Sequence, residues 1–326
     1  MRKIREKLFL FIIAVCSFSC TQSIDLIDFV ISSEQERVLQ TAHCYLKEFP
    51  VTITAFESPR SAGGKHDYFS EGDYWWPDPE NPEGPYVRKD GQSNPDNFDW
   101  HRKALIRLSL HVPALTSAFI LTNDSIYAAK ALEHLRAWFI NESTRMNPHL
   151  TYAQAIHGRV TGRGVGIIDT IHLIEVVQSV KILYDIKAIP EEDFQAVQQW
   201  FDEYLQWMTT HDYGIDERDR INNHGSCWVL QVAVFAELTE NDSLINDARE
   251  RFKKFLLPNQ LAEDGSFPLE LARTKPYSYS LFNMEILGAI AHILSTPQEN
   301  LWEYTLHNGA SLRTAVDFII PYIRNK

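Results

Sequence analysis

The sequence predicts an all-α protein, and its pattern of apolar residues is the main reason. Apolar residues recur at three- and four-residue steps in 101–121, 123–141, 167–186, 191–209, 223–238, 241–256, 278–295 and 308–323. Short polar turns separate these segments, and no alternating strand pattern or βαβ unit accompanies them. Helices joined by short turns pack as antiparallel neighbours. We therefore expect an (α/α)n toroid, or an incomplete barrel of antiparallel helical hairpins, with a superhelical stack as the alternative.

Polar residues mark the starts of several of these helices. The triplet Asn-Asp-Ser occurs at 123–125 and again at 241–243, and its side-chain oxygens can accept from the first free N–H groups of a helix. Pro190 is followed by two glutamates, which is typical of a first helical turn. These positions predict where three of the helices begin.

The segment 56–100 differs from the rest, because it is rich in proline, glycine, aspartate and aromatic residues. A long loop inside a compact domain is usually functional or disordered, and the aromatic residues favour order. We expect an ordered lid or cleft wall. Aromatic side chains beside basic ones suit an acidic sugar, and the candidate contacts are Tyr74, Trp75, Trp76 and Arg88. The alternative is a loop fixed in place by its own aromatic residues.

Two further segments contain side chains suited to proton transfer. Asn223 and His224 stand at the predicted start of an apolar helix, where the helix dipole favours an anion. Arg273 and Tyr279 lie in a segment interrupted by Pro276. A cation beside a phenol favours the phenolate, so we expect Arg273 to lower the pKa of Tyr279.

This set matches the requirements of β-elimination from a uronic acid. The reaction needs neutralisation of the carboxylate, a base for the C5 proton and an acid for the departing O4. Asn223 and Arg273 suit the first task. His224 or Tyr279 suits the second, and Tyr279 suits the third; which of the two is the base stays open.

The chain resembles the alginate lyase superfamily of (α/α)-toroid polysaccharide lyases, including uronan lyases of the Bacteroidetes type. The similarity covers about 60–323, and its motifs are Tyr-Trp-Trp-Pro-Asp-Pro at 74–79, Asn-Pro at 147–148, Tyr-Ala-Gln at 152–154, Asn-Asn-His-Gly at 222–225 and Arg-Thr-Lys-Pro at 273–276 followed by Tyr279. The resemblance implies that Asn223 and Arg273 neutralise the uronate carboxylate while His224 and Tyr279 share the base and acid roles, with Tyr277 as a rival tyrosine. Members of this group usually continue beyond the segment matching 315–323, so we expect one domain over 20–326 that is short at its C-terminus.

Further polar residues are candidates for the walls of the cleft. Arg159 and Arg163, with Gln154 and His157, could bind outlying carboxylates, although ordinary surface charge explains them equally well. The acidic residues Glu263, Asp264 and Glu270 are compatible with a paired-carboxylate glycosidase, but their proximity to Arg273 in the sequence fits support of that arginine at least as well.

Neither a metal nor another cofactor is expected. The sequence has no His-Glu-x-x-His, no cluster of cysteine and histidine, and no calcium loop of the EF-hand type. The glycine-rich stretch 162–166 follows no predicted strand, so we expect a helix entry there rather than a dinucleotide site. The net charge of −12 argues against nucleic acid as a partner.

The N-terminus has the pattern of a secretory signal. A basic start and a short apolar run, 8–15, precede Ser19 and Cys20. We expect a lipoprotein-type signal over 1–19 and a lipid on Cys20, which would place the protein in the periplasm or at the outer membrane; ordinary cleavage to a soluble periplasmic protein is the alternative. We expect no later segment to be long and apolar enough to cross a membrane. Cys44 and Cys227 are expected to be buried apolar residues, not a disulfide.

The sequence therefore predicts a lyase that cleaves a 1,4-linked uronic-acid polymer, alginate or else glucuronan, into 4,5-unsaturated products. A hydrolase acting on uronides from a similar toroid is the first alternative. A glycan-binding lipoprotein without catalytic activity is the second.

Overall fold

The computed structural model describes residues 26–324. The predicted signal over 1–19 and the predicted lipid site at Cys20 lie outside the described residues, so both stay predictions.

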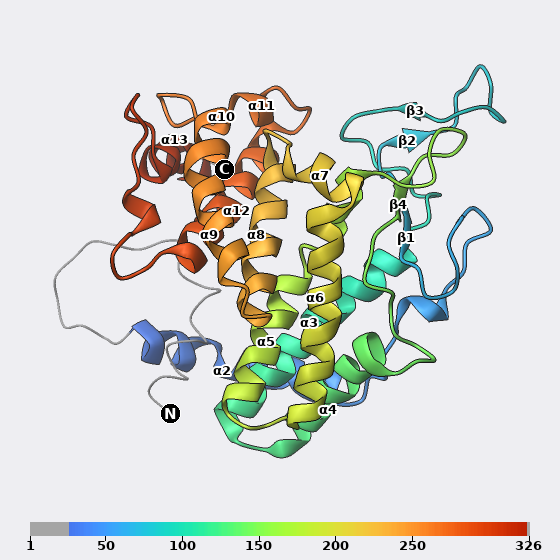
Figure 1. Cartoon of the computed structure of the whole chain (residues 1–326), viewed down its shortest axis with the longest axis vertical. Helices are drawn as coiled ribbons and strands as arrows, with labels where there is room; N and C mark the ends of the chain where they lie inside the picture. The colour runs from blue at the N-terminus through green and yellow to red at the C-terminus, as the bar shows by residue number, and fades with distance from the viewer. Residues whose placement is uncertain (1–25, 325–326) are drawn as a thin grey trace.

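The described chain is mainly helical (Figure 1). Its longer helices are α2 (Leu26–Tyr45), α3 (Trp100–Thr122), α4 (Ser125–Leu135), α5 (Leu173–Asp185), α6 (Glu191–Thr210), α7 (Asp212–Arg218), α8 (Asn223–Leu238), α9 (Asp242–Arg251), α12 (Pro276–Leu294) and α13 (Leu312–Arg324). Two short ones, α10 (Leu257–Gln260) and α11 (Pro268–Leu271), precede α12. Single π-helical turns extend α4 over Arg136–Ile140 and precede α10 over Phe252–Leu256. Short 3₁₀ helices cover Ile53–Ala55, Gly164–Thr170 and Leu301–Glu303.

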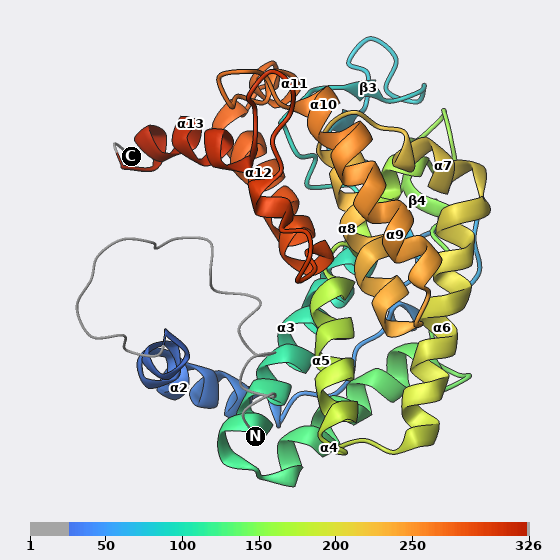
Figure 2. The ribbon, with the colours of Figure 1, turned by 60° about the vertical axis from the view of Figure 1, so that its left-hand side comes forward.

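The helices pack as neighbours along a curved array, in which α8 is central. It contacts α5, α6, α9 and α12, and Figure 2 shows these helices side by side. Every residue of α8 is buried except His224 and Glu237. This packing confirms the all-α prediction and agrees with an (α/α) toroid. The starts of α8 and α12 lie at the same end of the array as the strands (Figure 1).

The predicted helix starts are confirmed where polar residues cap them. Asp124 accepts from the backbone N–H of Ile126, and Asn241 accepts from that of Leu244. Asn222 caps α8 by accepting from the backbone N–H of His224. Each contact satisfies a helix N–H group that has no partner within the helix.

The aromatic segment is ordered, as expected, and it contains short strands that the sequence did not predict. β1 (Phe69–Glu71) pairs in parallel with β4 (Tyr152–Ala155), and β2 (Trp75–Trp76) pairs antiparallel with β3 (Val87–Arg88). Strands this short show no measurable alternation of apolar and polar residues. We call residues 56–99, which carry β1 to β3, the aromatic lobe.

A buried aspartate attaches the aromatic lobe to the helical body. Asp169 accepts from the hydroxyl groups of Ser70 at 2.6 Å and Tyr68 at 3.2 Å, and from Nε2 of Gln154 at 3.0 Å. Arg102 of α3 lies 3.3 Å from the same carboxylate. These contacts attach the aromatic lobe firmly to the core, since a buried carboxylate must keep its hydrogen-bond partners.

Several details differ from the expectations. Within the described chain, α3 is long and apolar enough to cross a membrane, with a mean hydropathy of 1.6, so the expectation that no such segment exists was wrong. This helix packs instead against α2, α4 and α5, and half of its most apolar 18-residue stretch is buried. The charged stretch around 216–220 belongs largely to α7. Cys227 is buried as expected, whereas Cys44 is exposed, and both are free thiols.

Candidate active site

The four predicted catalytic side chains come from two segments that meet where α8 and α12 begin. Asn223 and His224 form the first turn of α8. Arg273 lies between α11 and α12, and Tyr279 in the first turns of α12. Glu270 of α11 joins the two segments, because its side chain binds Asn223 and it is three residues from Arg273.

Asn223 is fixed by a buried carboxylate. It is 2% exposed, and Glu270 is 1% exposed. The backbone N–H of Asn223 donates to Oε1 of Glu270 at 2.8 Å, and its side-chain Nδ2 donates to Oε2 at 2.7 Å. An amide nitrogen carries two hydrogens, so one remains for an incoming acceptor. The negative charge of Glu270 also helps to raise the pKa of Arg273, but the hydrogen bonds of its carboxylate go to Asn223.

His224 is backed by a second buried carboxylate. Its Nδ1 lies 2.7 Å from Oε1 of Glu217, which comes from α7 and is 0% exposed. A carboxylate accepts, so it selects the tautomer with the proton on Nδ1 and leaves Nε2 as the acceptor. His224 is one of only two residues of α8 that are not buried. The imidazole is therefore arranged as a proton acceptor.

Arg273 and Tyr279 form a tight pair. Nη2 of Arg273 donates to the Tyr279 hydroxyl at 2.8 Å, and the guanidinium carbon lies 3.9 Å from the centre of the Tyr279 ring. The hydroxyl of Tyr74, from the aromatic lobe, is 2.7 Å from that of Tyr279. This geometry brings Tyr279 against the predicted arginine.

The expectation of a lowered tyrosine pKa was wrong. Burial is the largest influence and raises the pKa of Tyr279 well above its usual value. The hydrogen bond with Tyr74 and the negative charge of Asp90 raise it further, and together they outweigh Arg273, which lowers it. Tyr279 is therefore a phenol at neutral pH, which suits a proton donor.

Asp90, which the sequence did not single out, contacts Arg273 from the aromatic lobe. It accepts from Nε of Arg273 at 3.3 Å and from Nη2 at 3.0 Å. Thr274 Oγ1 donates to it at 3.0 Å and Arg88 at 2.6 Å. Although burial would raise its pKa, these donors hold the pKa of Asp90 well below its usual range. Arg88, a predicted substrate contact, is thus engaged with Asp90.

The two predicted tryptophans lie beside cations of the chain itself. Guanidinium groups of Arg159 and Arg163 are 5.3 and 5.9 Å from the centre of the Trp75 ring. Nζ of Lys89 is 5.0 Å from the centre of the Trp76 ring, whose Nε1 donates to a backbone carbonyl of the lobe. Both rings are half-buried. They fix the lobe and also leave part of each ring to solvent.

Gln154 and Arg163 lie together beneath the aromatic lobe. Arg163 donates through Nε to the backbone carbonyl of Gln154 at 2.8 Å and through Nη2 to its side chain at 3.0 Å. Burial lowers the pKa of Arg163, and the charges of Arg88 and Glu217 both act on it. Arg163 is therefore within electrostatic reach of both the lobe and α7. His157 is exposed, with its ring 5.1 Å from that of Tyr86.

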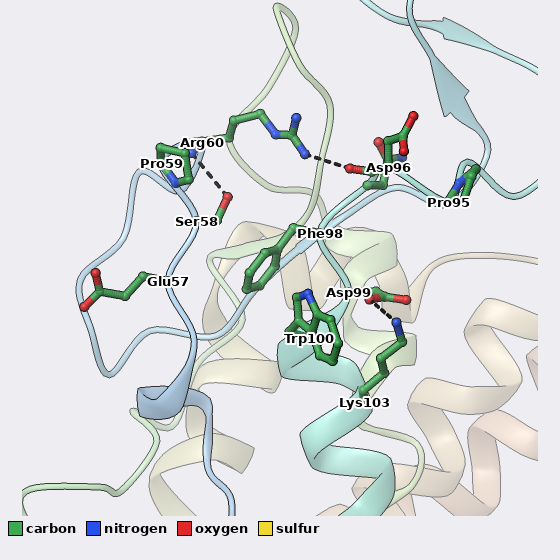
Figure 3. A pocket seen from close by; sticks show the side chains of 11 residues that line it. Glu57, Ser58, Pro59, Arg60, Pro95, Asp96, Phe98, Asp99, Trp100 and Lys103 are labelled. Carbon is green, nitrogen blue, oxygen red and sulfur yellow. Dashed lines mark hydrogen bonds and ion pairs between the residues drawn. The ribbon is translucent and has the colours of Figure 1, made fainter.

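Of two hollows in the described chain, one of about 310 Å³ is lined in part by His157 and Arg159, and the other lies away from the predicted site residues. The latter, of about 350 Å³, is walled by Arg60, Phe98, Trp100 and Lys103 (Figure 3). In Figure 3 Lys103 points toward Asp99 and Arg60 toward the backbone of Asp96. The hollow contains none of the predicted site residues.

Glu217, Glu270 and Asp90 are the site residues that the sequence did not assign correctly. A signal existed for Glu217, because it stands seven residues before His224 in a strongly charged stretch. Asp90 follows the Tyr-Trp-Trp-Pro-Asp-Pro motif of the aromatic lobe, but it belongs to no recognisable sequence motif itself. Among residues 26–324, no group of three or more His, Cys, Asp or Glu side chains is arranged to hold a metal ion.

Comparisons with known proteins identify the family of this chain. The family model "Alginate lyase" matches residues 52–326. The crystal structure of an alginate lyase from Bacteroides ovatus superposes with a TM-score of 0.84 at 34% identity, covering 92% of this chain and 82% of that one. No curated protein matches the sequence.

More distant structures share the fold. Alginate lyase A1-III from Sphingomonas species A1 gives a TM-score of 0.56 at 16% identity, covering 90% of this chain and 77% of that one. A variant of alginate lyase A1-III complexed with tetrasaccharide gives 0.59 at 14% identity, covering 90% and 76%. Since the family model spans most of the chain and the Bacteroides enzyme matches nearly all of it, this protein belongs to the alginate lyase family and is a polysaccharide lyase.

Proposed function

We propose that the protein cleaves a 1,4-linked uronic-acid polymer by β-elimination, with alginate as the first substrate and glucuronan as the second. One observation supports this most strongly. His224, backed by the buried Glu217, and Tyr279, held by Arg273, are provided by segments that Glu270 links together. Such an arrangement supplies a base, an acid and an amide in one place.

The proposed reaction assigns a task to each side chain. Asn223 and Arg273 bind the uronate carboxylate, which lowers the cost of negative charge developing at C5. Nε2 of His224 takes the C5 proton, and the phenol of Tyr279 gives its proton to O4 as the C4–O4 bond breaks. The electron pair of the C5–H bond becomes the C4–C5 double bond. The raised pKa of Tyr279 keeps the phenol protonated before the reaction, as the acid role requires.

Further residues are proposed to hold the sugars on either side of the cleaved bond. They are Tyr74, Trp75, Trp76, Arg88, Gln154, His157 and Arg163. Tyr74 has the strongest support, because its hydroxyl is in direct contact with that of Tyr279. Arg163 is supported by its position within reach of the charges of both Arg88 and Glu217.

A uronide hydrolase is a weaker proposal, because the buried carboxylates near the site already have partners. Glu217 binds His224, and Glu270 binds Asn223, so neither faces the cleft as a free acid or base. A glycosidase needs two such carboxyl groups on either side of the bond it cleaves. We also propose secretion by the signal over 1–19 and anchoring by a lipid on Cys20, in the periplasm or at the outer membrane.

The decisive experiment is incubation with polymannuronate, polyguluronate and glucuronan while ultraviolet absorbance of the 4,5-unsaturated product is followed. We expect absorbance with at least one polymer. New reducing ends without absorbance would indicate a hydrolase instead, and binding without either product would indicate a glycan-binding protein.

A further inference from the structure

Asp90 links the aromatic lobe to the segment that precedes α12. Its carboxylate receives four hydrogen bonds, from two nitrogens of Arg273, from Thr274 and from Arg88. Arg273 is 183 residues away in the sequence. The aromatic lobe and the segment before α12 therefore meet at an ion pair that adjoins the reacting phenol.

We propose that Asp90 is a positioning residue, whose carboxylate anchors the Arg273 guanidinium against Tyr279 and balances its charge so that the phenol serves as the proton donor. The inference rests on the proposed function and deepens it. It assigns a role to a residue of the aromatic lobe that does not itself touch the reacting atoms.

The orientation of Arg273 is the first argument. A guanidinium has five N–H groups in a planar fork. Nε and Nη2 bind Asp90, and Nη2 also binds the Tyr279 hydroxyl while the fork stacks on the ring. Rotating the guanidinium would break these contacts together. The two hydrogens of Nη1 are then directed elsewhere, and they are the ones offered to a substrate carboxylate.

The fit of the backbone is the second argument. Gly91 has φ +71°, a left-handed conformation that favours glycine. A Cβ at this position would lie 2.3 Å from Oγ1 of Thr274. The chain after Asp90 therefore approaches Thr274 as closely as a glycine allows, which fixes the distance between Asp90 and Arg273.

The charge near Tyr279 is the third argument. The groups that act on its hydroxyl are Tyr74, Arg273 and Asp90. A lone arginine at 2.8 Å would stabilise the phenolate, but Asp90 opposes that effect and contributes to the raised pKa of Tyr279. Without the carboxylate, the phenol would lose its proton at a lower pH.

A rival interpretation is that Asp90 only occupies the place of the substrate carboxylate and leaves when substrate binds. The two interpretations differ in their kinetics. A positioning residue stabilises the transition state, so its loss lowers kcat. A placeholder competes with substrate, so its loss lowers KM and leaves kcat unchanged.

The test compares Asp90→Asn with the wild-type chain on the polymer that gives the highest rate. We expect kcat to fall about ten- to a hundredfold, the cost of a misplaced catalytic group. We also expect the alkaline limb of the kcat profile to move to lower pH, and Asp90→Glu to recover part of kcat. Asp99→Asn, in the same lobe, is the matched control, since it removes the ion-pair partner of the exposed Lys103 of α3 and should leave kcat unchanged. A lower KM with unchanged kcat would overturn the proposal.

A second measurement needs no turnover and separates this inference from the proposed function. The ultraviolet absorbance of phenolate is titrated with pH in wild type, Asp90→Asn and Tyr279→Phe, and the last identifies the step due to Tyr279. We expect that step to occur at lower pH in Asp90→Asn. An unmoved step would refute the role of Asp90 even if the enzyme is an active lyase. Absence of elimination in the wild-type chain on every polymer would refute the proposed function and leave this result standing.

Discussion

The two halves of the candidate site are built differently. On the α8 side, His224 and Asn223 are fixed by Glu217 and Glu270, which belong to neighbouring helices and are almost fully buried. On the α12 side, Tyr279 is fixed by Arg273 and by Tyr74 of the aromatic lobe, and all three are partly exposed. The proposed base is therefore part of the core, whereas the proposed acid is held in part by the aromatic lobe.

This difference has a consequence for the reaction. A core carboxylate cannot move without unfolding its surroundings, so the base stays ready in the absence of substrate. The lobe is attached to the acid by hydrogen bonds between side chains on an accessible surface. We therefore expect changes on the α8 side to affect chemistry alone, and changes on the lobe side to affect both chemistry and its pH dependence.

The largest expected effect is the loss of the acid itself. Tyr279→Phe removes the hydroxyl and keeps the ring, so turnover should fall by about 10²–10⁴-fold, the range of a general acid or base. Binding of the polymer should persist, as measured by calorimetry of this variant with an oligosaccharide of the same polymer. Full activity in this variant would contradict the assignment of Tyr279.

Removing the charge behind the base should have the next largest effect. Glu217→Gln keeps the shape but not the charge, and we expect kcat to fall roughly 10–100-fold with KM little changed, as when a carboxylate behind a histidine is lost. The melting temperature serves as the control for folding. An unchanged kcat would show that the α8 side does not depend on its buried carboxylate.

A smaller effect is expected where the lobe meets the acid. Tyr74→Phe removes one hydrogen bond, worth about 1 kcal/mol, so kcat should fall by about three- to tenfold. Because Tyr74 raises the pKa of Tyr279, its loss should lower that pKa. An acid acts only while protonated, so the alkaline limb of the kcat–pH profile should move to lower pH. A limb that moves to higher pH would show that the contact with Tyr74 does not raise the pKa of Tyr279.

The smallest effect on catalysis is expected far from both halves. His111 of α3 and His134 of α4 are buried, and burial lowers their pKa values to about 4 and about 3. Arg107 and Lys130 lower both further, and Glu48 opposes this at His111. The unfolded chain therefore binds more protons at these two histidines than the folded chain does. Their contribution to the free energy of unfolding is fully present above about pH 6.5 and is lost as pH falls toward 4.

His134→Leu removes one of these groups and should make the melting temperature less dependent on pH between 6 and 4, with kcat at neutral pH unchanged. The wild-type chain and Asp99→Asn serve as references. A melting temperature with the same pH dependence in all three would show that this histidine does not contribute to acid sensitivity.

Much of the site followed from the sequence because its elements are local. The apolar period and the Asn cap define α8, and they place Asn223 and His224 at its start. Pro276 begins α12 and places Tyr279 in its first turns. These features depend on residues within one or two helical turns, which is the range over which sequence pattern determines structure.

The partners of these residues did not follow, because they are distant in the sequence. Tyr74 and Tyr279 are 205 residues apart, and Asp90 and Arg273 are 183 apart. Neither pair has a pattern that a single sequence displays. The short strands of the aromatic lobe were missed for a similar reason, since their pairing and not their composition defines them.

The sequence alone thus determined the all-α fold and the family resemblance, and it predicted the four side chains that we propose carry the chemistry. Only the tertiary structure decided how they behave. The sequence placed Arg273 six residues from Tyr279 and predicted a lowered phenol pKa. The structure adds burial, Tyr74 and Asp90, and together they raise that pKa. A local cation is visible in a sequence, but the desolvation and the distant charge that outweigh it exist only once the chain has folded.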